Sequence, residues 1–448
     1  MIHIFDHYGN ETRDLHQTLK AAGYAAPTVV LMPDGFLPED VISPFTYFLG
    51  KKTGKPRFFN QIQVPAYWEI LGTSQSGQVM DHNQERARIL YNDQSHRRFV
   101  KQVDWLGPNG QVRITDHYDQ YGTIFAKTIL NPEGQPLTTS YLTEDGEERL
   151  VENHVTGDLI LTLPDQGMRV FPDRISFYRY FLEAAKLPQD QICFNSLATP
   201  FLLSYQLSGK AGQDFLFWQE PLAEEIPGNM QLILDMDQIR CQKIIIPDLV
   251  TYERALRLVP ADKHHKLATL GYDYPFKKDN FLRREAFILT NSDQIEQLEF
   301  LLQQLPDLTF RIAALTEMSS KLMSMQQYSN VVLYPNASSS QVENLFMKTD
   351  FFFDINYSNE VMRANRQAFE HNQVIFAFEE TLHDGRYVAE EHIFKAAAAE
   401  EMVKTVQSLL NKDLEMMRQA LGAQGCRAHY MSGKAFAWRF RALGGRHG

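Results

Sequence analysis

The segment from Asp354 to Ile375 carries polar side chains where a predicted strand, a loop and a helix follow one another. Two amides, Asn359 and Gln367, stand eight residues apart, and Glu360 and Glu370 lie near them. A carboxylate carries charge and can exchange a proton, whereas an amide cannot. If the helix began at Asn359, Glu360 would point about 100° away around it. The segment therefore lies where a ligand site could form, and it offers both amides and carboxylates.

Other short patterns are better explained by structure than by chemistry. The run Gly50–Pro56 has three residues between its glycines, and proline follows the lysine, so it predicts a basic linker and not a phosphate loop. His3 and His7 are predicted to be core or loop residues. The three cysteines are widely spaced and form no zinc or disulfide pattern: Cys193, Cys241 and Cys426. We expect no metal site and no cofactor.

The elements around these residues change character twice along the chain. The first part reads as strand, helix, strand, which is typical of a parallel sheet. Residues 57–165 alternate with a period of two between glycine turns and predict an antiparallel β-meander. Strand–helix alternation then returns, and five apolar strands from residue 286 onward predict a second doubly wound unit. Within it, one helix is predicted to begin near Asp293 and another to be capped by Ser338 with Gln341.

This pattern predicts an α/β fold. Two Rossmann-like domains face a cleft, and the β-meander is inserted in the first. The expected division is 1–56 for the start of the first domain, 57–165 for the inserted sheet, 166–280 for the rest of the first domain, 281–412 for the second domain, and 413–448 for a C-terminal helix that returns to the first domain.

Composition limits the class of protein. The 448 residues include 44 Lys and Arg against 55 Asp and Glu, which gives a net charge of -11. Such an acidic chain is not expected to bind nucleic acid, because phosphate neutralisation needs a basic surface. The N-terminus lacks the pattern of a signal peptide, and no run of 18 apolar residues is present. We therefore expect a cytoplasmic, reduced protein.

The segment from Asp354 resembles the donor site of two-domain nucleotide-sugar glycosyltransferases. In that class one glutamate contacts the sugar, and a second, eight residues on and just before an alanine, holds the ribose. Aligned on Ala368, these positions are Asn359 and Gln367 here. The class also uses Arg and Lys after the first strand of its second domain, but none occurs between Arg284 and Arg311. Each lost phosphate contact is worth roughly 1.5–3 kcal/mol, so the resemblance implies a vestigial site.

Over nearly its whole length the chain resembles the glycosyltransferase-stabilising proteins of the accessory Sec system, the GtfB-like family. The ensemble of strings that carries the likeness is Val29-Val30-Leu31, Asp34-Gly35-Phe36-Leu37-Pro38, Ser43-Pro44-Phe45, Phe59-Asn60-Gln61, Val64-Pro65 and Tyr67-Trp68-Glu69-Ile70. The resemblance implies a GT-B-like fold and a catalytically silent partner of a paralogous, active N-acetylglucosaminyltransferase. It further implies that the two form a hetero-oligomer that modifies serine-rich repeat adhesins before export. The silent subunit would stabilise its partner and hold the acceptor polypeptide.

Two alternatives stay open from the residues. One is an active retaining glycosyltransferase that uses Glu360 and Glu370. The other is an unrelated nucleotide- or sugar-binding module. Turnover of a nucleotide sugar by the isolated chain would distinguish an active enzyme from a silent subunit. Copurification with a homologous transferase would distinguish a silent subunit from an unrelated binding module.

Two surfaces are candidates for contacts with other molecules. The inserted sheet has edges that can pair with a partner or an extended peptide, and its candidate contact residues are Trp105, Tyr118, Tyr121 and Tyr141. The C-terminal stretch has no acidic residue after Glu415 and several basic ones. Arg439 and Arg441 are the candidates for weak contact with an anionic membrane on its cytoplasmic face.

Overall fold

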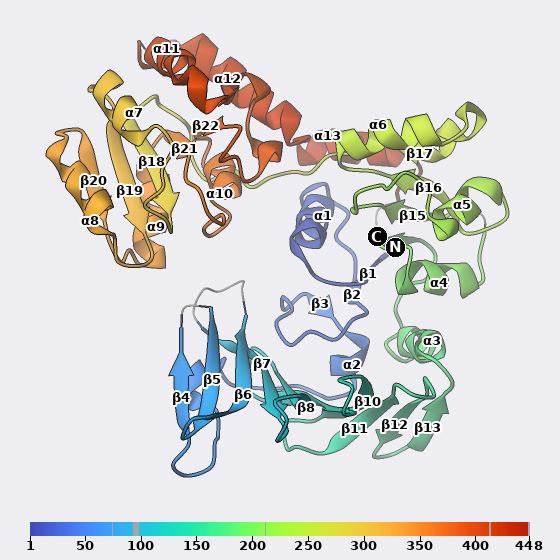
Figure 1. Ribbon diagram of the computed structural model, residues 1–448. Helices are drawn as coiled ribbons and strands as arrows, with labels where there is room; N and C mark the ends of the chain where they lie inside the picture. The colour runs from blue at the N-terminus through green and yellow to red at the C-terminus, as the bar shows by residue number, and fades with distance from the viewer. Residues whose placement is uncertain (74, 93–97, 211, 412–413, 447–448) are drawn as a thin grey trace. The chain divides into compact units, whose positions relative to one another are not determined.

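The computed structural model describes residues 1–73, 75–92, 98–210, 212–411 and 414–446. The chain folds into two compact units, one made of Met1–Leu270 with Ala437–Gly448 and the other of Gly271–Phe436 (Figure 1). Among the described residues no helix has both the length and the apolar character that crossing a membrane requires.

The first unit is built on a parallel sheet in the order β17-β16-β15-β14-β1-β2-β3. Its strands are β1 Ile2–Phe5, β2 Thr28–Val30, β3 Val41–Ile42, β14 Ile192–Phe194, β15 Asp214–Phe217, β16 Cys241–Ile245 and β17 Leu267–Ala268. Its helices are α1 Asn10–Ala21, α2 Pro44–Tyr47, α3 Arg174–Ala184, α4 Thr199–Gln206, α5 Gly228–Asp235 and α6 Leu249–Leu258. The chain reverses its direction of sheet growth between β1 and β14, which places a topological switch point at their carboxyl ends.

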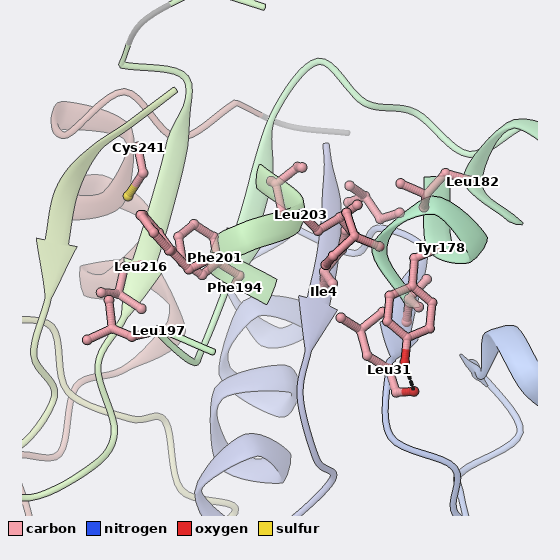
Figure 2. Close-up of a cluster of buried hydrophobic side chains, with 14 of the residues drawn as sticks. Ile4, Leu31, Tyr178, Leu182, Phe194, Leu197, Phe201, Leu203, Leu216 and Cys241 are labelled. Atoms are coloured by element: carbon pink, nitrogen blue, oxygen red, sulfur yellow. Dashed lines mark hydrogen bonds between the residues drawn. The ribbon is translucent and has the colours of Figure 1, made fainter. Parts of the chain in front are cut away.

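The core of this unit explains why its central strands are almost wholly apolar. Figure 2 shows side chains of β1, β14 and β15 gathered with those of the helices, among them Ile4, Phe194, Leu216 and Leu203. The one polar group of Tyr178 is satisfied there, since its hydroxyl donates to the carbonyl of Leu31 at 3.2 Å. Burial on both faces favours continuous apolar strands over alternating ones.

An antiparallel sheet of ten strands is inserted after α2, and its strands pair in simple chain order (Figure 1). They are β4 Glu69–Gly72, β5 Ser76–Asp81, β6 Gln84–Tyr91, β7 Val100–Leu106, β8 Val112–Tyr118, β9 Ile124–Leu130, β10 Pro136–Leu142, β11 Glu148–Asn153, β12 Leu159–Leu163 and β13 Gly167–Phe171. The predicted β-meander is confirmed, with β4 and β13 as its edges.

The inserted sheet is buried against two separate cores. Tyr141 and Leu150 join the main core of the first unit, where the Tyr141 ring lies 4.5 Å from that of Phe45. Tyr118 and Val103 belong to a smaller core, which the short 3-10 helix η1, Phe59–Gln61, and the residues after it help to form. The sheet is therefore anchored on the α/β part over some of its strands and has its own core under others.

The second unit has six parallel strands in the order β20-β19-β18-β21-β22-β23. They are β18 Glu285–Thr290, β19 Thr309–Ala314, β20 Val331–Tyr334, β21 Phe351–Asp354, β22 Val374–Phe378 and β23 Ile393–Phe394. Its helices are α7 Leu298–Gln304, α8 Ser320–Met323, α9 Ser339–Lys348, α10 Ala364–Glu370, α11 Ala399–Leu410 and α12 Leu414–Arg427. The capping box predicted at Ser338 and Gln341 is present at the start of α9.

The helix predicted from Asp293 begins later, at Leu298, so its predicted start was wrong. The backbone before it pairs elsewhere: Glu296 N–H donates to the carbonyl of Ile355 at 2.7 Å. Gln297 then adopts a left-handed conformation, φ 53°, which separates this pairing from the helix. Tertiary hydrogen bonds here override the helical spacing of the apolar residues.

The C-terminal stretch contains two helices where one was predicted. α12 packs Met417 and Ala420 into the core of the second unit. α13, Gly433–Ala442, ends in the first unit, where the Phe440 ring lies 4.9 Å from those of Tyr24 and Phe215. The predicted boundary at residues 412 and 413 lies outside the described residues.

Candidate functional site

The carboxyl ends of β18 and β21 form the switch point of the second unit, which is where open α/β sheets bind ligands. Asp354, the last residue of β21, is the centre of a polar cluster there. Its carboxylate accepts from the Asn365 amide at 2.6 Å, from the His383 backbone N–H at 2.8 Å and from His383 Nδ1 at 2.5 Å. The cluster thus joins β21 to α10 and to the loop after β22.

His383 closes the loop that follows β21. Its Nε2 donates to the carbonyl of Ser358 at 2.7 Å, while Nδ1 donates to Asp354. The hydrogen bond with Asp354 raises the pKa of His383 to about 9, so the imidazolium is charged at neutral pH. Ser358 has a φ of 91°, a strained value for a residue with a side chain, and its carbonyl is held by this contact.

A pH dependence follows from the charged state of His383. Its folded pKa lies above the ordinary value of 6.5, so its stabilisation is complete below pH 6.5 and is lost as the pH rises through about 9. Replacing His383 with glutamine should therefore cost most stability at low pH and progressively less toward pH 9. Thermal unfolding of both proteins across this range measures the difference. A difference that stays constant with pH would contradict a charged His383.

The two amides at the vestigial positions occupy different environments. Asn359 is exposed in the loop before α10. Gln367 is half-buried in α10, and its amide donates to the carbonyl of Met362 at 2.8 Å. Because α10 begins only at Ala364, Glu360 does not lie on the helix, and the angle considered in the sequence does not apply. Asn359 and Gln367 remain our candidates for a vestigial sugar-nucleotide site.

The two glutamates that an active enzyme would use are held by separate local contacts. Glu360 accepts from the Asn365 backbone N–H at 2.9 Å, and burial, with the charge of Asp354 nearby, raises its pKa. Glu370 is buried and pairs with Arg366 at 2.8 Å and with Lys277 at 3.5 Å. Glu370 is therefore already neutralised by the chain's own cations, which suits a structural role.

The cavity beside β18 is lined by acidic side chains, whereas a bound diphosphate would need basic ones. A cavity of about 320 Å³ lies at the carboxyl ends of β18 and β19, and its polar lining includes Asn291, Ser292, Asp293, Thr316, Glu317 and Ser319. Its lining contains two carboxylates and no Lys or Arg. A pyrophosphate placed here would meet like charge and lose the cation contacts that normally hold it.

The tyrosines proposed as contact residues fall into two groups. Tyr118 and Tyr141 are buried in the two cores, so the prediction that they offer contact surface is wrong. Alternate residues of a strand face opposite sides, and each of these tyrosines is on the side that faces a core. Trp105 is half-buried and donates from its indole N–H to Asp116 at 2.7 Å. Tyr121 lines a cavity in the first unit.

The structure also reveals residues whose importance the sequence did not indicate. His383 reaches Asp354 only through the fold, and no spacing pattern links them. Lys52, part of the predicted basic linker, has a buried side chain and pairs with Asp119 at 3.0 Å. Within this linker, Lys52 joins the chain before the sheet to the turn after β8. Among the described residues no group of three or more potential metal ligands comes together.

Comparison with known proteins agrees with this architecture. Four family models match in chain order: the GtfB N-terminal domain at residues 2–48, the GtfB middle domain at 68–172, the GtfB third domain at 174–258 and the GftB/GlyA-F C-terminal domain at 286–424. A curated protein of Streptococcus gordonii, named UDP-N-acetylglucosamine–peptide N-acetylglucosaminyltransferase stabilizing protein GtfB, is 52% identical over 451 residues and covers 100% of both chains.

The chain belongs to the GtfB family of stabilising proteins.

Solved structures support the same assignment. A chain in the crystal structure described as the GtfA/B complex bound to UDP and GlcNAc matches with a TM-score of 0.95 and 51% identity, over 99% of this chain and 100% of that one. The pneumococcal O-GlcNAc transferase GtfA, solved with UDP and GlcNAc, matches with a TM-score of 0.51 and 11% identity, over 99% and 98% of the two chains. This second match shows that the GtfB-family chain shares its GT-B fold with a transferase.

Proposed function

We propose that this GtfB-family chain is the noncatalytic subunit of a protein O-N-acetylglucosaminyltransferase. It stabilises an active, paralogous transferase and binds the serine-rich acceptor polypeptide for modification in the cytoplasm before export by the accessory Sec system. The observation that carries the proposal is the acidic crevice beside β18, together with amides at Asn359 and Gln367. A chain that has the glycosyltransferase fold but lacks the groups that hold a nucleotide-sugar donor is suited to be a binding subunit.

A second binding subunit has a physical advantage for this acceptor. A serine-rich polypeptide is expected to be disordered and to offer few features that one catalytic cleft can grip. A second site on an attached subunit raises the local concentration of the acceptor near the active site. The subunit that supplies this second site does not need to be catalytically active.

The inserted sheet supplies the surface that we propose for docking. Its edge strand β13 exposes Met168 and Val170, with 67% and 57% of their surfaces accessible. Val170 pairs with Ile160, and Ile160 with Val151, so these side chains form a row across three strands. Exposed apolar residues beside an unpaired strand edge favour contact with another protein. Trp105 and Tyr121 are the other candidate contacts.

The isolated chain is expected not to transfer or hydrolyse UDP-N-acetylglucosamine, because the cavity beside β18 has no Lys or Arg in its lining and amides stand at Asn359 and Gln367. A radiolabelled-sugar assay with a serine-rich peptide measures this, alone and after coexpression with the homologous transferase. Activity should appear only in the copurified complex, and Glu360→Ala should leave that activity unchanged. Transfer by the isolated chain that Glu360→Ala abolishes would establish the alternative, an active retaining enzyme using Glu360 and Glu370.

We further propose a weak peripheral contact with the cytoplasmic face of the membrane through α13. Phe440 is buried against Tyr24 and Phe215, whereas Trp438, Arg439 and Arg441 are exposed on the same helix. An exposed indole beside guanidinium groups suits the headgroup region of an anionic bilayer, where each basic residue contributes about 1 kcal/mol.

Replacing Arg439 and Arg441 with glutamate is expected to abolish flotation of the protein with anionic phosphatidylserine vesicles at low salt. The fold should be retained, because both residues are exposed whereas Phe440 is buried. Wild-type binding should weaken as salt is added, since the attraction is screened. Equal flotation of the wild type and the double variant at low salt would remove the membrane contact and leave α13 only its packing role.

A further inference from the structure

A polar cavity of about 680 Å³ lies within the first unit, apart from the vestigial site. Three segments and one residue of α2 line it: residues 34–41 after β2, the linker 50–53, the turn 119–121 after β8, and Thr46. Its volume is in the range of ordinary ligand pockets. Residues 34–41 lead from β2 into β3, so the cavity lies beside this edge of the parallel sheet.

The walls of this cavity are fixed by buried contacts. Lys52 and Asp119 form an ion pair at 3.0 Å in which both side chains are buried. The same Asp119 carboxylate accepts from the backbone N–H of Tyr121 at 3.1 Å and of Thr123 at 3.0 Å. A Cβ on Gly35 would lie 2.4 Å from the Tyr118 carbonyl, so only glycine allows this close approach. The three segments are thus held together before any ligand arrives.

The lining carries hydrogen-bonding groups of both kinds without an excess of positive charge. Its charged residues are three acids and two lysines: Asp34, Glu39, Asp119, Lys51 and Lys52. Since Lys52 and Asp119 neutralise each other, Lys51 is the remaining cation, against two carboxylates. This balance disfavours a phosphate or nucleotide and suits a neutral ligand that both donates and accepts hydrogen bonds.

The sheet edge next to the cavity favours a polypeptide. β3 is the last strand of the parallel sheet, and Val41 of this strand lines the cavity. An extended peptide can add to such an edge through its main chain, which needs no distinctive side chains. The Thr53 hydroxyl, which donates to Glu144 at 2.9 Å, and the Tyr121 hydroxyl, which accepts from the Gln120 amide at 3.4 Å, can still accept hydrogen bonds from serine and threonine hydroxyls.

We propose that this cavity, with Lys51, Thr53 and Tyr121 on its wall, binds the unmodified, hydroxyl-rich acceptor polypeptide in extended form. The inference rests on the proposed acceptor-binding function and gives that function a place in the chain. It assigns to the linker between the first domain and the inserted sheet a role in substrate contact.

Binding of a fluorescein-labelled, unglycosylated serine-rich peptide to the purified complex with the transferase tests this assignment. Lys51→Trp fills the cavity, and Tyr121→Ala removes part of its wall. Each is expected to weaken peptide binding about tenfold, which corresponds to about 1.4 kcal/mol, while complex formation on a sizing column stays unchanged. Lys55→Trp is the matched control, because Lys55 is exposed on the same linker but does not line the cavity.

A second readout does not depend on how the variants fold. A benzophenone amino acid placed at Lys51 should crosslink the peptide, and the same group at Lys348 in the second unit should not. Peptide binding by the wild type with no loss in either cavity variant would overturn the cavity assignment but leave the proposed function standing. Failure of the wild-type complex to bind the peptide would remove both. Displacement of the peptide by free N-acetylglucosamine would indicate that the cavity binds a sugar, and it would overturn the proposal that the cavity binds the polypeptide.

Discussion

Replacing Asp350 with alanine is expected to lower the free energy of unfolding of the second unit by about 3–5 kcal/mol, because it leaves a buried cation without its partner. Asp350 is fully buried beside the first residue of β21. Its carboxylate accepts from Lys278 Nζ at 2.6 Å and from Arg283 Nη2 at 2.6 Å. It also accepts from the backbone N–H groups of Phe281 at 3.0 Å and Arg283 at 2.8 Å.

The electrostatics of Asp350 support this size of effect. Burial alone would raise its pKa, but hydrogen bonds from Arg283 and Lys278 outweigh burial and lower the pKa below the usual range. Lys278 is itself buried, and its burial lowers its pKa. Without the carboxylate, Lys278 would have to remain charged in an apolar environment or release its proton.

Urea unfolding followed by circular dichroism measures the loss. Asp307→Ala is the matched control: Asp307 pairs with Arg284 at 3.1 Å in the same unit, but 78% of its side chain is exposed. Its removal should cost less than about 1 kcal/mol. The double variant Asp350→Leu with Lys278→Met should recover part of the loss, since it removes both buried charges together. A loss for Asp350→Ala no larger than that of Asp307→Ala would contradict the argument.

The strands of the second unit could be predicted closely because burial on both faces leaves a continuous apolar run. The five apolar strands predicted from residue 286 onward are present as β18 to β22, and β21, Phe351–Asp354, is buried along its whole length. The start of α7 could not be predicted, because Ile295 follows the spacing of a helix but pairs with Asn356 across the unit. A pattern of apolar residues cannot indicate that a distant strand competes for the same backbone groups.

The candidate site was located by residue type, but its organisation was not. The segment after Asp354 stood out because it lies between a strand and a helix and resembles the donor site of two-domain glycosyltransferases. The role of His383 depends on a contact between residues 29 positions apart, which only the strand order creates. Likewise, the sequence showed that Tyr141 lies on a strand but not which face of the sheet meets the α/β core. Which face of a sheet is buried depends on the elements that pack against it. The alternation of side chains along a strand does not reveal this.

Replacing Arg174 with methionine is expected to weaken the packing of the inserted sheet on the α/β part of the first unit. Arg174, at the start of α3, binds the carboxylate of Glu152 on β11 with two hydrogen bonds of 2.5 and 2.9 Å. Glu152 is buried. The burial of Tyr141 and the negative charge of the adjacent Glu152 raise the pKa of Tyr141 well above the usual range. Losing the guanidinium leaves this carboxylate unpaired in the core, at a cost of about 3–5 kcal/mol.

Because the proposed docking surface lies on this sheet, the same substitution should weaken association with the transferase as well as stability. Urea unfolding and a sizing column run with the partner measure the two effects. Arg88→Met is the matched control, since Arg88 pairs with Glu85 at 3.1 Å on an exposed part of the same sheet, and it should change neither by more than about 1 kcal/mol. Adding Glu152→Gln to Arg174→Met should restore part of both, because it removes the uncompensated charge. If Arg174→Met reduces stability but leaves partner binding intact under folding conditions, then docking does not depend on how this sheet is anchored, and the transferase must bind elsewhere on the chain.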